Sequence, residues 1–321
     1  MKLAITAVVI LLAAVAMANL FHVKQISSVE PQPVPTAPAS SQPASRPGTR
    51  SALGALPVWN DGLAEICYYD ARRPIYGVER RYTSVHIVNR EWFEPVAGVK
   101  TDRIDDPTAV AVLKLNVAEE VPTENYNYRL LTTLFVRRDD LSPLKLVGSS
   151  QEWCGSIFNI FRWQDDRLDG RTFSYFEGEA EQTFELAVAV RPLEAFLLIA
   201  RDAVASGDAQ PRERAAPYLA QLAPARRGPA SRTPAPLGCQ VRVEPAAHAT
   251  VPAGRFMARR VLLTAGDDAG PLGEALIEVA PPHRVLRYAL GGVIGELRDV
   301  ERRAYWDGKW SSEHYERGRA P

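Results

Sequence analysis

Short strand-like runs follow one another closely along this chain, from residue 57 to about residue 191 and again from residue 239 to residue 300. In the run 82–88, Val85 and Ile87 alternate with Ser84 and His86, which is the two-residue period of a strand. Few helical patterns separate these runs, so parallel βαβ units are not expected. The sequence therefore predicts a mainly β fold built as an antiparallel meander.

One internal helix is predicted, over residues 192–205 (PLEAFLLIARDAVA). Leu193, Phe196, Leu197 and Ala200 have the spacing of an apolar helical stripe, and a proline opens the segment. Residues 206–238 are rich in Pro, Arg and Ala and are expected to form a surface loop. We expect a single β-rich globular domain over residues 57–321, with two packed β-halves as the alternative.

The N-terminal residues 1–24 predict a signal peptide or a membrane-anchoring helix. From residue 3 to residue 21 only Thr6 and Asn19 interrupt an apolar run, and residues 16–18 (AMA) resemble a cleavage site. Residues 25–56 are rich in Pro, Ser and Ala and predict a flexible linker. We expect an exported protein that is periplasmic, secreted, or anchored in the inner membrane through an uncleaved N-terminal segment and facing the periplasm.

The charge balance argues against a nucleic-acid partner. The chain of 321 residues has 38 Lys and Arg against 38 Asp and Glu, a formal net charge of zero. Binding to nucleic acid depends largely on an excess of positive charge, so no nucleic-acid partner is expected.

The chain has three cysteines, Cys67, Cys154 and Cys239, which are too few and too widely spaced for a structural zinc site. An exported protein can form a disulfide. Cys67 and Cys154 form the preferred pair because both lie in strand-like runs, and two buried thiols are the alternative.

Several short motifs resemble those of uncharacterised bacterial envelope proteins that are known only as domains of unknown function. The matching stretches include residues 251–256 (VPAGRF) before a strand, residues 281–288 (PPHRVLRY), and residues 149–155 (SSQEWCG). The resemblance implies a curved sheet of the lipoprotein-carrier type, a half-barrel or open barrel, that can hold an apolar or lipid-like ligand. It implies no activity. Attachment through acyl chains is not expected, because no cysteine lies near the end of the N-terminal apolar run.

Aromatic side chains are the candidates for lining a ligand cavity inside a curved sheet. The alternative is that they form ordinary core contacts and cross-strand pairs. The residues proposed to line the cavity are Tyr126, Tyr128, Trp153, Phe158, Phe161 and Tyr175.

No cofactor and no metal site are expected. The five histidines form no HxH, HExxH or HxxxH pair, and the chain has no GxSxG, P-loop or strand-linked GxGxxG motif.

An enzyme would have to use the unusual segment 149–155 or the acidic run 177–181. In segment 149–155, Cys154 would be a nucleophile with Glu152 or a distant histidine as its partner. A strand end with a packed Trp153 and a buried or disulfide-bonded Cys154 explains the same residues more simply. We therefore expect a non-enzymatic envelope protein that binds an apolar molecule or aids envelope assembly. The alternatives are a periplasmic enzyme dependent on Cys154 or on carboxylates, and an interaction module that pairs through an exposed sheet edge.

Overall fold

The computed structural model describes residues 50–164, 167–187, 190–207, 216–219, 236–265 and 270–308. The chain divides into two compact units, residues 1–44 and 45–321, and all described residues belong to the second. The predicted signal or anchor segment, 1–24, and the predicted linker up to residue 49 lie outside the described residues. Within the described ranges, no helix has the length and apolar character needed to cross a membrane.

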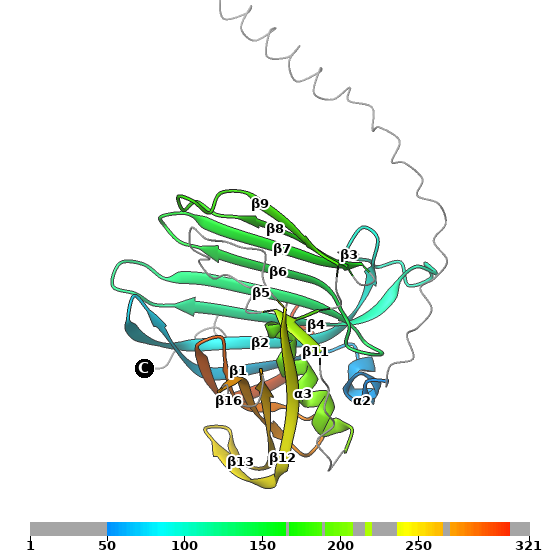
Figure 1. Cartoon of the computed structure of the whole chain (residues 1–321). Helices are drawn as coiled ribbons and strands as arrows, with labels where there is room; N and C mark the ends of the chain where they lie inside the picture. The colour runs from blue at the N-terminus through cyan, green and yellow to red at the C-terminus, as the bar shows by residue number, and fades with distance from the viewer. Residues whose placement is uncertain are drawn as a thin grey trace, which may run out of the picture. The chain divides into compact units, whose positions relative to one another are not determined.

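Most of the described chain forms one large, curved, open sheet (Figure 1). The N-terminal strands follow each other as an antiparallel meander, in which the short β3 (Val99–Lys100) pairs only with β2. The strands on the main path are β1 (Ala64–Ile75), β2 (Val78–Glu94), β4 (Val110–Val121), β5 (Tyr128–Arg137), β6 (Pro143–Gln151), β7 (Ser156–Gln164), β8 (Arg167–Phe173) and β9 (Gln182–Leu186).

The C-terminal strands extend the same sheet on the other side of β1. They are β12 (Leu237–Val251), β13 (Gly254–Thr264), β14 (Pro271–Glu278), β15 (Val285–Leu290) and β16 (Val293–Arg303). Strand β16 pairs antiparallel with β1, so the two meanders meet in the middle of the sheet. The predictions of a mainly β fold, a curved antiparallel meander and one internal helix are confirmed.

The sheet curls until its two ends come close together. Its end strands are β9 and the two-residue β10 (Arg191–Pro192), which pairs in parallel with β11 (Ala216–Leu219). Leu186 and Arg191 are five positions apart in the chain, so their Cα atoms are separated by at most roughly 17 Å. The end strands are five and two residues long, and such short edges do not favour an interaction module that pairs through a sheet edge.

The predicted alternation in residues 82–88 is present, and the structure decides which side faces inward. Ser84 and His86 are buried, whereas Val85 and Ile87 are half-buried and pack against a small cluster on the other face. The polar His86 is accommodated because its ring lies 4.5 Å from that of Tyr69 and 5.0 Å from that of Tyr288. Both faces of β2 are therefore covered.

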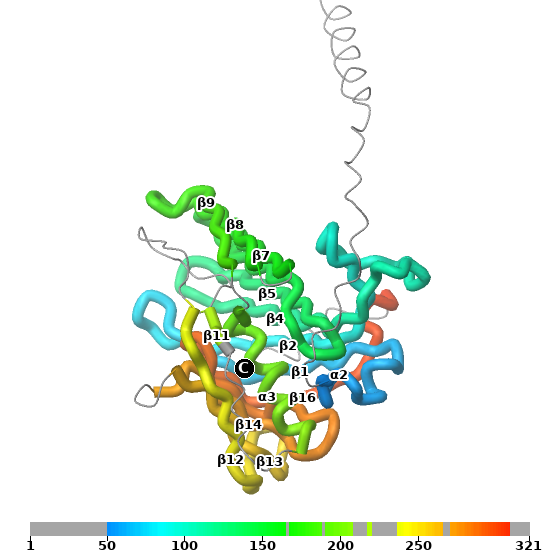
Figure 2. Tube along the Cα trace, turned by 45° about the vertical axis from the view of Figure 1, so that its right-hand side comes forward, coloured from blue at the N-terminus to red at the C-terminus, as the bar shows by residue number. Residues whose placement is uncertain are grey.

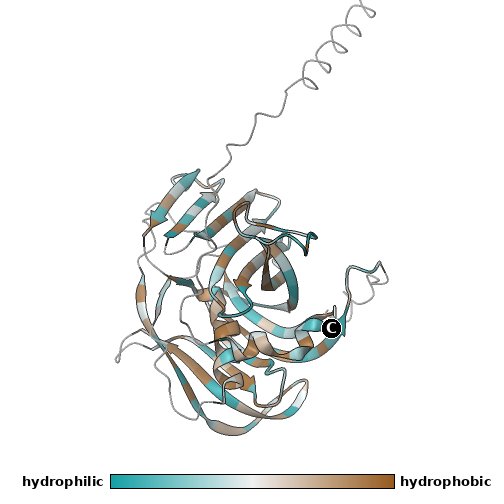
Figure 3. Cartoon of the chain, turned by 90° about the vertical axis from the view of Figure 1, so that its right-hand side faces the viewer, coloured by the Kyte–Doolittle hydropathy of each residue, from teal (hydrophilic) through white to brown (hydrophobic). Residues whose placement is uncertain are grey.

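The internal helix lies within the curve of the sheet (Figure 2), where the chain is strongly apolar (Figure 3). A 3-10 turn, η2 (Leu193–Ala195), leads into α3 (Phe196–Ala205), close to the predicted range. Every residue from Phe196 to Val204 is buried, not only the apolar stripe. The helix is enclosed because strands β12 to β15 pack around it.

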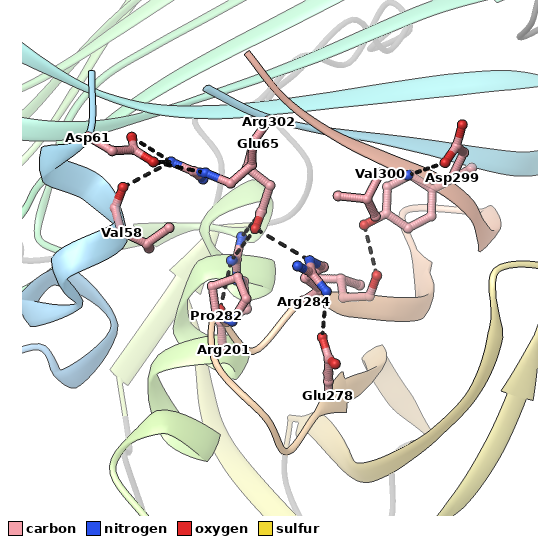
Figure 4. A network of polar contacts seen from close by, with 12 residues as sticks. Val58, Asp61, Glu65, Arg201, Glu278, Pro282, Arg284, Asp299, Val300 and Arg302 are labelled. Carbon is pink, nitrogen blue, oxygen red and sulfur yellow. Dashed lines mark hydrogen bonds and ion pairs between the residues drawn. The ribbon is translucent and has the colours of Figure 1, made fainter. Parts of the chain in front are cut away.

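Buried ion pairs attach α3 to the sheet (Figure 4). Arg201 pairs with Glu65 of β1 at 2.8 Å, with side chains only 3% and 1% exposed, and it donates a hydrogen bond to the Pro282 carbonyl at 2.9 Å. Arg284 lies 3.9 Å from the same glutamate and 3.2 Å from Glu278. The charges of two carboxylates, Glu65 and Glu278, are therefore matched by those of two guanidinium groups, Arg201 and Arg284, in a largely buried cluster.

The fold begins earlier than the sequence predicts. Asp202 accepts hydrogen bonds from the Ser51 hydroxyl at 2.8 Å and from the Leu53 N–H at 3.0 Å. Ser51 also caps the short helix α2 (Ala52–Ala55), which the 3-10 turn η1 (Pro57–Asn60) follows. Residues 51–56 are therefore part of the folded body rather than of the predicted linker. Their composition resembles that of a linker, and contacts with distant residues fix them: the buried Asp202 carboxylate on α3, and Arg138, which donates a hydrogen bond to the Gly54 carbonyl at 2.6 Å.

The predicted surface loop 206–238 is wrong in two places. Strand β11 lies within it, and β12 begins at Leu237. Residues 208–215 and 220–235 lie outside the described residues.

The expected Cys67–Cys154 disulfide is wrong. All three cysteines are free: Cys67 and Cys239 are buried, and Cys154 is exposed. Cys67 lies in β1, whereas Cys154 follows β6, which is four strand positions away along the sheet. Four spacings amount to about 19 Å, while bridged cysteines need Cα atoms within about 7 Å. Both segments look like strands in the sequence, but the sequence does not show how many strands separate them.

Replacing Glu65 by Gln is expected to lower the free energy of unfolding by about 3 kcal/mol, because Arg201 would remain buried without its counter-charge. Urea denaturation of the full chain measures this effect. The matched control is Glu79→Gln, which removes a carboxylate that is 54% exposed and is expected to change stability by less than about 1 kcal/mol. Equal stability of the two variants would show that the buried pair does not hold α3.

Candidate functional site

The meander places alternate connections at the same end of the sheet, because each antiparallel strand reverses the direction of the one before it. The β1–β2, β4–β5, β6–β7 and β8–β9 connections therefore share one end, toward the left in Figure 1. Each carries an aromatic residue near its tip. We call these residues, together with the first residue of β5, the aromatic rim: Tyr76, Tyr126, Tyr128, Trp153 and Tyr175.

Three rings of the aromatic rim form a column. The rings of Tyr128 and Tyr126 lie 5.7 Å apart at 30°, and those of Tyr126 and Trp153 lie 5.8 Å apart at 18°. Tyr76 joins the base of the column through a hydroxyl–hydroxyl contact of 2.6 Å with Tyr128. Trp153 is the last ring and remains 85% exposed, so a large aromatic surface faces solvent.

Local turn geometry explains why these rings protrude. Tyr76 and Gly77 both have positive φ, 52° and 76°, which suits a tight two-residue hairpin turn and leaves Tyr76 outside the sheet. Glu152 and Gly155 close the β6–β7 turn with two backbone hydrogen bonds of 2.9 and 3.3 Å, so Trp153 and Cys154 lie at its corner. A Cβ on Gly155 would lie 2.4 Å from the Tyr175 ring, so only glycine allows this packing.

A pocket adjoins the exposed end of the column. We call it the rim pocket. It has a volume of about 370 Å³, within the range of small-molecule sites. Apart from Tyr126 and Trp153, its lining is polar and consists of Glu120, Asn127, Arg129, Gln151 and Glu152.

The polar groups of the rim pocket are partly paired with one another. Glu120 accepts a hydrogen bond from the Asn127 amide at 2.8 Å and lies 3.8 Å from the Arg129 guanidinium. Glu152 accepts a hydrogen bond from the Tyr175 hydroxyl at 3.1 Å. Burial, together with this hydrogen bond to a carboxylate, raises the pKa of Tyr175 to about 12. The Tyr175 hydroxyl therefore stays protonated and remains a donor at neutral pH.

Cys154 lies beside the column and is in contact with a tyrosine hydroxyl. Its Sγ is 2.8 Å from Tyr126 Oη, and this hydrogen bond raises the pKa of Tyr126. A nucleophilic thiol needs a base as its partner, and the contact made here is with a hydroxyl. Of the histidines considered as partners, His86 lies inside the sheet, and His248 and His283 lie in β12 and in the β14–β15 connection, whereas His314 lies outside the described residues. Catalysis by Cys154 stays a hypothesis that this arrangement does not favour.

A second, smaller space lies inside the curve, between the start of the helical segment and the sheet. We call it the interior gap, and its volume is about 70 Å³. Burial lowers the pKa of His86 to about 3, so its imidazole is neutral, and its Nε2 has no hydrogen-bond partner within the described part of the chain. The gap is lined by His86, Leu115, Val117, Glu119, Thr132, Leu134, Leu193, Glu194, Leu197, Tyr288, Leu290 and Val293.

The six aromatic residues proposed from the sequence do not line one cavity. Tyr126 and Trp153 line the rim pocket, and Tyr128 and Tyr175 adjoin it. Phe161 is fully buried in the core against Phe184. Phe158 lies on the opposite face of β7 and is 42% exposed. None of the six lines the interior gap, because α3 occupies the centre of the curve.

Sequence reasoning missed the polar lining of the rim pocket: Glu120, Asn127, Arg129 and Gln151. A signal for it is present, since aromatic residues recur in every second connection of the meander and polar residues flank them. It can be found only by counting strands in order and asking which turns share an end.

The acidic run 177–181 lies in the β8–β9 connection, and its described side chains do not form a group of possible metal ligands. Its buried member, Glu179, accepts a hydrogen bond from the Ser174 hydroxyl at 3.0 Å. Over residues 50–308, leaving aside the undescribed gaps, no three His, Cys, Asp or Glu side chains are grouped as metal ligands.

No family model matches the chain, and no curated protein matches it in sequence. A solved structure that is similar to it is described as a beta-barrel-like protein of domain of unknown function DUF1849 from Brucella abortus. The two share 10% identity and a TM-score of 0.42 over 74% of this chain and 97% of the other. A likeness at this level carries no argument about family or function.

The exposure of the thiols leads to a labelling prediction. In the native full chain, iodoacetamide is expected to modify one cysteine, Cys154, because Cys67 and Cys239 are buried and burial raises the pKa of both thiols. Mass spectrometry counts the added groups, and unfolding in denaturant without reductant should expose all three. Cys154→Ser should abolish native labelling. Only one reactive thiol after unfolding would instead indicate a disulfide.

Proposed function

We propose that this protein is a non-enzymatic binding protein of the bacterial cell envelope that holds a small ligand in the rim pocket. The observation that carries the proposal is the pocket of about 370 Å³ beside a column of three aromatic rings, whose last ring, Trp153, is 85% exposed. A tryptophan so far out of the core contributes little to stability. Its large, rigid surface is the kind that binding sites use as an anchor.

The N-terminal sequence supports the envelope location. An apolar segment over residues 1–24, followed by a Pro-, Ser- and Ala-rich stretch, has the composition of an export signal or anchor with a tether.

Native mass spectrometry tests the binding role. The full chain, purified without detergent after incubation with a bacterial envelope extract, is expected to retain a non-covalent mass. Trp153→Ala should lose that mass, since the terminal ring of the column is removed while the buried core is untouched.

The matched control is Trp306→Ala, which removes another exposed tryptophan that contacts a tyrosine but lies outside the rim pocket. It should retain the mass. An apoprotein mass for the wild type, or equal retention by both variants, would contradict a ligand site at the rim.

A second candidate is an apolar or lipid-like ligand in the interior gap, and two observations favour it. Seven of the lining residues are Leu or Val, and His86 offers an unpaired Nε2 as a polar anchor. The gap of about 70 Å³ is small beside typical ligand cavities of about 300 Å³ or more. A whole acyl chain would therefore require Leu193 and Leu197 to move away from the sheet.

Thr132 and Leu131 provide a test of this second candidate, since they are neighbours on β5 that face opposite sides. Thr132→Trp would fill the interior gap, whereas Leu131→Trp adds the same ring to a site that is already 44% exposed. Titration with the fluorescent fatty acid cis-parinaric acid is expected to show binding to the wild type and to Leu131→Trp but not to Thr132→Trp. Binding to all three, or to none, would remove the interior gap as a lipid site.

A further inference from the structure

We infer that the ligand of the rim pocket is a neutral oligosaccharide whose pyranose ring stacks on Trp153. This inference rests on the proposed binding function and names its substrate class. It follows from three features of the pocket: the exposed face of Trp153, the mixed hydrogen-bond donors and acceptors around it, and the near-balance of charge.

The aromatic column supplies a platform for one flat, partly apolar ring. One side of Trp153 is occupied by Tyr126 at 5.8 Å with near-parallel planes, and the exposed remainder is available to a ligand. The axial C–H groups on one face of a pyranose carry partial positive charge. They suit the electron-rich face of an indole ring. A sugar ring placed there would continue the column by one more layer.

The polar lining matches the edge of such a ring. Each sugar hydroxyl both donates and accepts a hydrogen bond, so its site needs groups of both kinds. Asn127 and Gln151 provide amide donors and acceptors, Arg129 provides donors only, and Glu120 and Glu152 accept. Several of these groups already bond to one another, and their positions are therefore set before a ligand arrives.

A cationic ligand fits this geometry less well. Recognition of a quaternary ammonium group uses aromatic faces arranged around the cation. Here the rings lie face to face along a column and present one face to solvent.

A membrane surface fits less well too, although tyrosine and tryptophan are common at membrane interfaces. Glu120 and Glu152, two carboxylates against the one guanidinium of Arg129, line the pocket. Placing these carboxylates among lipid headgroups is unfavourable, most of all where the lipids are anionic.

Saturation-transfer difference NMR on the full chain tests the inference with three probes: maltotetraose, cellotetraose and chitotetraose. At least one is expected to show saturation of its ring C–H protons. Trp153→Ala should weaken binding by about tenfold or more. Trp306→Ala, the exposed tryptophan outside the pocket, should bind as the wild type does.

A second variant separates a neutral ligand from a charged one. Glu152→Gln removes a charge but keeps an acceptor oxygen for the sugar and for Tyr175. Saccharide binding is expected to weaken several-fold in this variant, because a carboxylate accepts a stronger hydrogen bond than an amide oxygen does. It should remain insensitive to NaCl, because a neutral ligand has no charge to screen.

The inference is overturned if none of the three tetrasaccharides shows transfer, or if Trp153→Ala leaves their binding unchanged. It is also overturned if choline, or vesicles of phosphatidylethanolamine and phosphatidylglycerol, bind in a Trp153-dependent manner while the saccharides do not. Retention of an envelope-derived mass in the native spectra, with no saccharide bound, would reject the sugar and leave the rim pocket as a binding site for another class.

Discussion

The ion pair between Arg201 and Glu65 is the contact on which the arrangement of the whole molecule depends. It joins the middle of α3 to the strand at which the two meanders meet, and it is almost fully shielded from water. Burying two charges is costly unless they are paired closely and hydrogen-bonded further. Those conditions are met only when the helix, β1 and the Pro282 carbonyl come together. The pair therefore selects one position for α3 within the curve of the sheet.

Fixing α3 at that position decides where open space remains in the described part of the molecule. The adjacent Asp202 holds the Ser51 segment, so the helix is fastened to the start of the fold as well. With the helix enclosed, the space left inside the curve is about 70 Å³, and the larger pocket lies outside, at the end of the sheet. A curved sheet alone would suggest a cavity in its interior. Because α3 fills that interior, the larger pocket lies beside the turns that connect the strands.

Local patterns predicted the elements well, because strand alternation and the helical stripe reflect burial of neighbouring residues. The helix was predicted at 192–205 and lies over Leu193–Ala205. The failures share a physical cause, which is distance in the chain. Cys67 and Cys154 both lie in or beside strands, but intervening strands keep them apart. Ser51 lies in linker-like sequence, and the carboxylate that accepts a hydrogen bond from its hydroxyl, Asp202, is 151 positions later in the chain. Of the proposed site residues, Tyr126 and Trp153 line the rim pocket, whereas Phe161 belongs to the core.

The sequence by itself determined the antiparallel class and the single internal helix, since each follows from the periodicity of a few adjacent residues. The tertiary structure decided which face of each strand is inside, that β16 closes on β1, and that Tyr76, Tyr126, Trp153 and Tyr175 share one end of the sheet. These facts depend on strand order and on pairing between distant segments. No short window of sequence contains that information, because the free energy that fixes it arises only when the segments pack together.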